Sequence, residues 1–187
     1  MSGVQAGLGS PPPGGGSIPT TPLHSFHATL PLAPKGKERP RASLPWPWIE
    51  KWLKGGKRGK QPIPHVYTRK PYQEWEQALA DLLAAEWGAS GRFSPLDEPC
   101  SLLLVLFFPR PKGRTLKTRP NPAYPHSVRP DGDNCAKAVQ DALQKGGVVK
   151  DDSRIFDLRV VKWVHAGGEE PRIEAILRWG PGCTLLR

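Results

Sequence analysis

Residues 129–153 read RPDGDNCAKAVQDALQKGGVVKDDS and hold the clearest pattern in the chain. Apolar residues recur there at the spacing of one helix face, namely Cys135, Ala138, Val139, Ala142 and Leu143. This pattern predicts a helix from Asn134 to Lys145, which Gly146 and Gly147 end. Asp131 and Asp133 come just before it, and Asp133 or Asn134 is expected to cap it. Lys137 follows Asp133 by one helical turn and shares its face, which Asp141 continues.

A second acidic pair, Asp151 and Asp152, follows the helix after a short apolar segment. A helix of twelve residues is about 18 Å long, and the returning segment Val148–Val149 can bring this pair back toward the helix start. Gathered carboxylates repel each other unless a cation such as Mg²⁺ neutralises them, and a bound Mg²⁺ can activate a phosphodiester. Taken singly, these residues are more often helix caps, turns or weak surface ion pairs. Their conjunction indicates a metal-dependent site on Asp131, Asp133 and Asp152, with Lys137 offsetting negative charge in the transition state.

Further elements are predicted on both sides of this segment. A first strand is expected at Leu23–Leu30, and a helix at Pro71–Trp87 that Gly88 ends. The continuous apolar run CSLLLVLFF at 100–108 indicates a buried central strand. Two strands follow at Ile155–Val164 and Arg172–Trp179. The fold class is therefore α+β, a mixed sheet with two principal helices.

The remaining segments have biased compositions. Residues 1–22 are rich in Pro, Gly, Ser and Thr and predict a disordered tail, followed by one domain at 23–180 and a C-terminal tail at 181–187. Residues 44–64 form a Trp-rich and Lys-rich insertion whose tryptophans favour a small packed cluster over a stacking surface for bases. Residues 109–130 are basic and proline-rich, which favours a loop without a regular element.

Composition narrows the class of function. The formal charge is +10 with a pI near 9.8, which suggests a polyanionic partner such as nucleic acid. The three cysteines have neither zinc-ligand spacing nor a disulfide pattern. No apolar run is long enough to span a membrane and no secretion signal is evident, so a cytoplasmic protein is expected.

The two motifs RPDGDNCAKAVQDAL and GGVVKDDSRIFDLRVVK resemble the RusA family of Holliday junction resolvases. The resemblance extends over roughly residues 24–180. It implies that Asp131, Asp133 and Asp152 are catalytic metal ligands, that Lys137 is the essential lysine, and that Asp151 is a supporting acid at the metal. It further implies a homodimer that nicks four-way DNA junctions with Mg²⁺, for which Mn²⁺ can substitute, in DNA recombination and repair. The basic residues expected to contact DNA are Arg39, Arg41, Lys117, Arg119 and Arg129.

Two other functions remain open from the sequence. One is a nuclease with the same site that acts on flaps or replication forks. The other is a non-catalytic junction-binding protein in which the additions at 1–22 and 44–64 block the site. Magnesium-dependent cleavage of different DNA structures distinguishes the three.

Overall fold

The computed structural model describes residues 23–55, 63–111, 121–181 and 183. The strands are β1 (His24–Leu30), β2 (Arg41–Ser43), β3 (His65–Tyr67), β4 (Cys100–Phe108), β5 (Tyr124–Pro125), β6 (Ile155–Val164) and β7 (Arg172–Trp179). The helices are α1 (Trp46–Lys54), α2 (Lys70–Ala89) and α3 (Gly132–Lys145), with a single 3₁₀ turn, η1 (Asp152–Arg154).

Five strands form the main sheet in the order β1-β7-β4-β6-β5. Strands β4 and β6 are parallel, while β1, β4 and β7 pair antiparallel, so the sheet is mixed as predicted. The parallel pair needs a crossover connection, and α3 lies within it. This crossover lays the predicted catalytic helix across the sheet beside β6.

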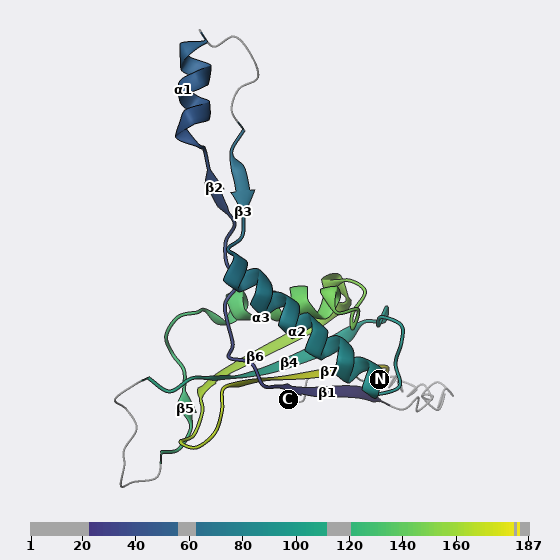
Figure 1. The fold of residues 1–187 in the computed structure, drawn as a ribbon. Coiled ribbons are helices and arrows are strands. Elements are labelled where there is room, and N and C mark those ends of the chain that lie inside the picture. Colours follow the sequence, from purple (N-terminus) through teal and green to yellow (C-terminus); the bar gives the residue numbers. More distant parts are fainter. Residues whose placement is uncertain (1–22, 56–62, 112–120, 182, 184–187) are drawn as a thin grey trace, which may run out of the picture.

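Helices α2 and α3 lie over the same face of the sheet (Figure 1). Their apolar stripes pack on alternate residues of β4 and β7, such as Leu104 and Ala175, which are fully buried. The two helices approach closely at Gly146, where a Cβ would lie 2.6 Å from the carbonyl oxygen of Ala80. Only glycine fits at this contact, so Gly146 sets the spacing of the helix pair as well as ending α3.

The other face of the sheet has no described helix over it. Side chains there alternate with the buried ones and are partly exposed, and the apolar ones are Leu103, Val105, Phe107, Val161, Trp163 and Ile176. Along β6, only Trp163 and Val164 pair with β5, so most of this strand forms an open edge among the described residues. Arg159, Arg172 and Glu174 share this face, so the described part of the chain leaves a partly apolar sheet face without a covering helix.

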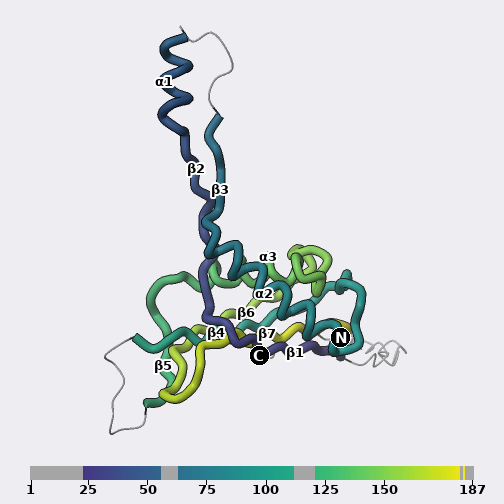
Figure 2. The backbone as a smooth tube through the Cα atoms, viewed as in Figure 1, coloured from purple at the N-terminus to yellow at the C-terminus, as the bar shows by residue number. Residues whose placement is uncertain are grey.

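The Trp-rich segment forms an arm that stands away from the body (Figures 1 and 2). Strands β2 and β3 pair as a two-stranded ribbon, and α1 lies at its far end. No residue of α1 is buried, so the expected packed cluster of tryptophans is wrong for the described residues. The glycine-lysine run at 56–62 lies outside the described residues.

The other elements match the sequence with a few differences. Helix α2 runs through Gly88 and ends at Ala89, because Trp87 packs its ring on Phe26 and the helix continues over the sheet. The basic loop contains the short strand β5, in which Pro125 needs no N–H because it lies at the sheet edge. Past Gly180, Cys183 is buried rather than frayed. No described helix has the length and apolar character to cross a membrane.

Candidate active site at helix α3

Helix α3 begins at Gly132, two residues earlier than expected. Asp131 is therefore the N-cap residue and Asp133 lies in the first turn, so neither Asp133 nor Asn134 caps the helix. The side chain of Asp131 makes no capping hydrogen bond, although its carbonyl accepts one from the Cys135 amide at 3.0 Å. Within the described part of the chain, the carboxylates of Asp131 and Asp133 have no ion-pair partner. Two unneutralised carboxylates at a helix start are favoured by the helix dipole and are open to a cation.

Lys137 lies in the second turn of α3 and contacts the carboxylate of Asp152. Its Nζ also lies 3.2 Å from Oδ1 of Asp141, one turn further along the same helix. The hydrogen bond to Asp152 raises the pKa of Lys137 above its ordinary value, with Asp141 adding to this effect. Lys137 shares a helix face with Asp133, as expected, but the ion pairs that the structure gives it are with Asp141 and Asp152. Lys137 instead joins the helix to the second acidic pair, across a sequence separation of 15 residues.

A further ion-pair network lies along the side of α3. Lys37, from the segment after β1, contacts Asp141 and also lies 3.2 Å from Oε1 of Glu76 on α2. Burial lowers the pKa of Lys37, but the hydrogen bonds that Lys37 donates to Asp141 and Glu76 outweigh that effect and raise it. Asp141 is thus held between two lysines, Lys37 and Lys137. This shared carboxylate fixes Lys137 relative to α2 and to the root of the arm.

The second acidic pair sits on a tethered turn. Oδ1 of Asp151 accepts a hydrogen bond from the Ser153 amide at 2.9 Å, which caps η1. The Ser153 side chain and then this amide lower the pKa of Asp151. On the other side, Arg154 Nη2 lies 2.7 Å from Asp97, which also pairs with Lys150. These contacts hold the turn so that Asp152 faces Lys137. Asp151 therefore has a structural role in the described residues, beside its predicted role at a metal.

The donor atoms of this region suit a hard divalent cation, because carboxylate oxygens are what Mg²⁺ and Mn²⁺ take as ligands. The described residues, however, contain no group of three or more acidic, His or Cys side chains already arranged to hold a metal. Asp131 and Asp133 lie together at the helix start, whereas Asp152 is engaged with Lys137. The carboxylates of Asp131, Asp133 and Asp152 are therefore the type of ligand that Mg²⁺ takes, while Lys137 neutralises the charge of Asp152 in this structure.

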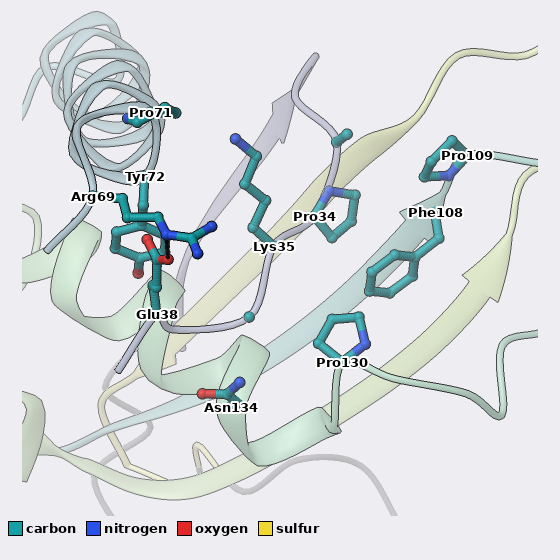
Figure 3. A pocket seen from close by; sticks show the side chains of 12 residues that line it. Pro34, Lys35, Glu38, Arg69, Pro71, Tyr72, Phe108, Pro109, Pro130 and Asn134 are labelled. Atoms are coloured by element: carbon teal, nitrogen blue, oxygen red, sulfur yellow. Dashed lines mark ion pairs between the residues drawn. The ribbon is translucent and has the colours of Figure 1, made fainter. Parts of the chain in front are cut away.

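A cleft of about 580 Å³ opens beside the start of α3 (Figure 3). Pro130 and Asn134 form one side, Phe108 and Pro109 another, and Tyr72 lies across from them. Its remaining lining comes from the arm root and the start of α2, namely Ala33, Pro34, Lys35, Gly36, Glu38, Arg69 and Pro71. An ion pair of 3.2 Å between Arg69 and Glu38 joins the two chain segments at the arm root, just outside β2 and β3. The cleft gives the helix start a mostly apolar wall with basic side chains around it.

The predicted DNA-contact residues fall into two groups. Arg39 and Arg41 are exposed at the arm root, and Arg129 is exposed two residues before Asp131. Lys117 and Arg119 lie outside the described residues and stay predictions. Arg39, Arg41 and Arg129 thus occupy the region around the cleft and the start of α3. Lys162 lies nearby as well, with its Nζ donating to the carbonyl of Pro130 at 2.7 Å.

Sequence reasoning missed the supporting residues Lys37, Glu76 and Asp97. Each contacts α3 or its following turn from a segment distant in the chain; Lys37 and Asp141, for example, are 104 residues apart. No local pattern marks such a partner, because a lone Lys or Glu in a polar segment usually points to solvent. These residues reach α3 and its following turn only because distant segments of the chain, such as α2 and the connection between β1 and the arm, pack beside α3.

The comparison with curated proteins gives no match for this chain. The comparison with protein families gives one that agrees with the motifs around α3. The chain matches the family described as Endodeoxyribonuclease RusA over residues 31–178, which begins just after β1 and includes the arm, both principal helices and most of β7. Because this match covers most of the chain and includes the acidic helix start, Lys137 and Asp152, the protein belongs to the RusA family of endodeoxyribonucleases.

Proposed function

We propose that this endodeoxyribonuclease resolves four-way DNA junctions by paired, Mg²⁺-dependent nicks, as a homodimer, in DNA recombination and repair. One observation carries the proposal. The carboxylates of Asp131 and Asp133, which have no ion-pair partner among the described residues, lie at the start of α3, and Lys137, one turn after Asp133, is held against Asp152. Family membership supplies the class of reaction, which is hydrolysis of a DNA phosphodiester at a Holliday junction.

Asp131, Asp133 and Asp152 are the residues that would hold Mg²⁺, or Mn²⁺ in its place, and Asp151 stands next to them on the capped turn. When bound, such a cation supplies a Lewis acid and an oriented water for attack on phosphorus. The chain's own contribution is to position that chemistry. The start of α3 supplies two carboxylates two residues apart, and the turn tethered through Asp97 supplies the third.

Lys137 contributes positive charge where negative charge develops. Its ammonium group is half exposed, so a phosphate oxygen can reach it from solvent. Asp141 and Asp152 hold it in place and raise its pKa, so it stays a cation at physiological pH. A fixed ammonium beside the reacting phosphate stabilises the transition state more than the ground state, which accelerates cleavage.

A homodimer is favoured by the uncovered apolar face of the sheet. Side chains such as Val105, Val161 and Ile176 share this face and are only partly shielded in the described residues. A two-fold pairing of these faces buries apolar surface and supplies two active sites, as paired nicks require. The test is the mass of the protein in solution for Val105→Lys, with Val66→Lys on the exposed arm as the matched control. A dimer that survives Val105→Lys unchanged would exclude this face as the interface.

The function is tested with a synthetic four-way junction, a linear duplex and a flap, each with and without Mg²⁺. We expect paired nicks on opposite strands of the junction only with metal. Cleavage of the flap instead would support the metal-dependent site but would exclude the four-way junction as the substrate. Junction binding without cleavage in any metal would favour a binding protein.

Lys137→Met is the informative variant, and Lys145→Met is its matched control on the same helix. Lys145 lies in the last turn, 3.7 Å from Glu76, and does not face the acidic pair. We expect nicking to fall by about 100-fold or more in Lys137→Met and to stay within about threefold in Lys145→Met. Equal losses in the two variants would mean that net charge, and not the position of Lys137, matters.

A further inference from the structure

Lys162 is a lysine within a row of apolar side chains on the helix-covered face of the sheet. Its neighbours in that row of β6 are Val160, which packs against the core, and Val164, which is buried. Its partner on the parallel strand β4 is Leu106, which is fully buried. An ionised side chain is costly to place in such a row unless polar groups receive it. Lys162, which is itself partly buried, is therefore expected to have polar partners.

The partners of Lys162 are two backbone carbonyls just before α3. Its Nζ donates to the carbonyl of Pro130 at 2.7 Å and to the carbonyl of Val128 at 2.9 Å. The carbonyl of Lys162 itself accepts a hydrogen bond from the His126 amide at 3.0 Å. Residues 126–131 belong to neither a strand nor a helix, so these bonds replace those that a regular element would supply. One residue of β6 thus holds three points of the segment that leads into the acidic helix start.

The hydrogen bond to Pro130 acts directly on Asp131. A peptide unit is planar, so the carbonyl oxygen of Pro130 and the N and Cα atoms of Asp131 lie in one rigid plane. A donor that fixes this oxygen therefore fixes the direction in which the chain enters Asp131. The side chain of Asp131 makes no capping hydrogen bond, so the helix start does not orient its carboxylate in that way. The position of this carboxylate depends on the backbone that Lys162 holds.

The arm root braces the same point through different atoms. Pro130 and Asn134 lie together where the chain enters α3 (Figure 3). The Lys37 amide donates to the carbonyl of Asn134 at 3.0 Å. Gly36 packs so closely that a Cβ there would lie 2.7 Å from Cβ of Pro130. The helix start is thus held between the arm root and the side chain of Lys162, which leaves little freedom to the residue between Pro130 and α3.

We propose that Lys162 is a positioning residue for Asp131 as a metal ligand. It holds the peptide between Pro130 and Asp131 so that the carboxylates of Asp131 and Asp133 face the same divalent cation. The inference rests on the proposed metal-dependent function, because it concerns the cation that these carboxylates would hold. Residues that orient a metal ligand without touching the metal have a large effect on metal affinity.

The charge of Lys162 and its hydrogen bonds have opposite effects on a cation. An ammonium group near the carboxylates repels a divalent cation, so removal of the charge alone would tighten metal binding. Loss of the two hydrogen bonds releases the segment before Asp131, which would weaken metal binding. The direction in which the metal affinity changes therefore distinguishes a positioning role from a purely electrostatic one.

The test measures binding of Mn²⁺ to the full-length protein, without DNA, by titration calorimetry. The relevant Mn²⁺ site is the one that Asp131→Asn removes, and thermal unfolding shows that each variant is folded. We expect Lys162→Met to weaken Mn²⁺ binding by about tenfold or more, and to raise the Mg²⁺ concentration for half-maximal nicking by a similar factor. Saturating Mg²⁺ should then restore the nicking rate to within about threefold of wild type. Lys162→Arg keeps the charge and the donors, so its Mn²⁺ affinity should stay within about threefold of wild type. The matched control Lys145→Met removes the same charge from the far end of α3 and should leave Mn²⁺ binding unchanged.

Two outcomes would overturn the inference alone. Unchanged or tighter Mn²⁺ binding in Lys162→Met would leave the lysine with at most an electrostatic role, and equal weakening in Lys162→Arg would show that its hydrogen bonds are not what matters. If Lys162→Met does not fold, Lys162→Gln, a shorter side chain without the charge, takes its place with the same expected direction. A wild-type protein that binds no Mn²⁺ would instead refute the proposed metal site and the inference together. Mn²⁺ binding does not depend on the DNA substrate, so cleavage of flaps in place of junctions would leave the inference standing.

Discussion

Asp141 is the residue whose replacement tests the architecture of the site most directly. Its carboxylate contacts both Lys37 and Lys137, yet it is not one of the predicted metal ligands. Asp141→Asn keeps the shape of the side chain and removes the charge. Lys37 then keeps Glu76, and Lys137 keeps Asp152. The variant therefore loosens the network without leaving a lysine entirely unpaired.

The size of the effect follows from the exposure of the three side chains. Asp141 is 23% exposed, while Lys37 and Lys137 are 33% and 50% exposed, so solvent screens both ion pairs in part. Partly exposed pairs of this kind contribute about 0.5–1 kcal/mol each, so we expect the free energy of unfolding to fall by about 1–2 kcal/mol for the two together. For a chain of this size, that loss lowers Tm by about 2–8 °C.

The assay combines thermal unfolding with single-turnover nicking of a junction. A double-mutant cycle with Lys37→Met isolates the Lys37–Asp141 coupling, which we expect at about 0.5–1 kcal/mol. Loosening of Lys137 should slow nicking by about tenfold with junction binding unchanged, since small misplacement of a catalytic group is costly. Asp141→Glu should recover part of the rate. A normal nicking rate in Asp141→Asn, despite a lower Tm, would refute the positioning role, and zero coupling would refute the network.

Four further outcomes can be checked. Asp133→Asn should abolish nicking while junction binding, measured by anisotropy, is kept or improved, because the change removes repulsion of phosphate; loss of both would indicate a folding role. Leu104→Ala should cost about 2–5 kcal/mol in urea unfolding because Leu104 is fully buried in the core, and a cost below 1 kcal/mol would contradict that packing. Gly36→Ala should lower Tm and slow nicking, since its Cβ would collide with Asn134 and Pro130; a variant like wild type in both would show that the arm root can shift freely. Burial raises the pKa of Cys100 to about 11, so the folded protein holds the thiol proton more tightly than the unfolded chain does. This contribution to stability is present at neutral pH and is lost as the pH rises from the ordinary thiol range toward 11. Alkylation of Cys100, followed by mass spectrometry, should be slow at about pH 8 in the folded protein, and rapid labelling would show that the thiol is accessible.

Local pattern accounts for the elements that the sequence predicted well. The apolar run 100–108 became the central strand β4, and strands β6 and β7 have the predicted bounds. Burial of alternate residues along β7 and of one stripe along α3 follows from the period of each element, which the backbone geometry of strands and helices determines. The resemblance to the RusA family also rests on local sequence motifs, and the family match confirmed it.

The tertiary structure decided what depends on distant segments. It assigned Lys137 to Asp141 and Asp152 rather than to Asp133, because the turn after α3 returns beside the helix and is anchored by Asp97. It also placed the Trp-rich segment on a projecting arm, since a cluster of tryptophans packs only where the chain offers a surface to cover. Sequence alone therefore determined which residue types stand near each other along the chain, namely the acids, the lysine and the apolar periods. The ion-pair partners of Lys137 and the exposure of the tryptophan rings depended on contacts between segments distant in the sequence, which local sequence patterns do not predict.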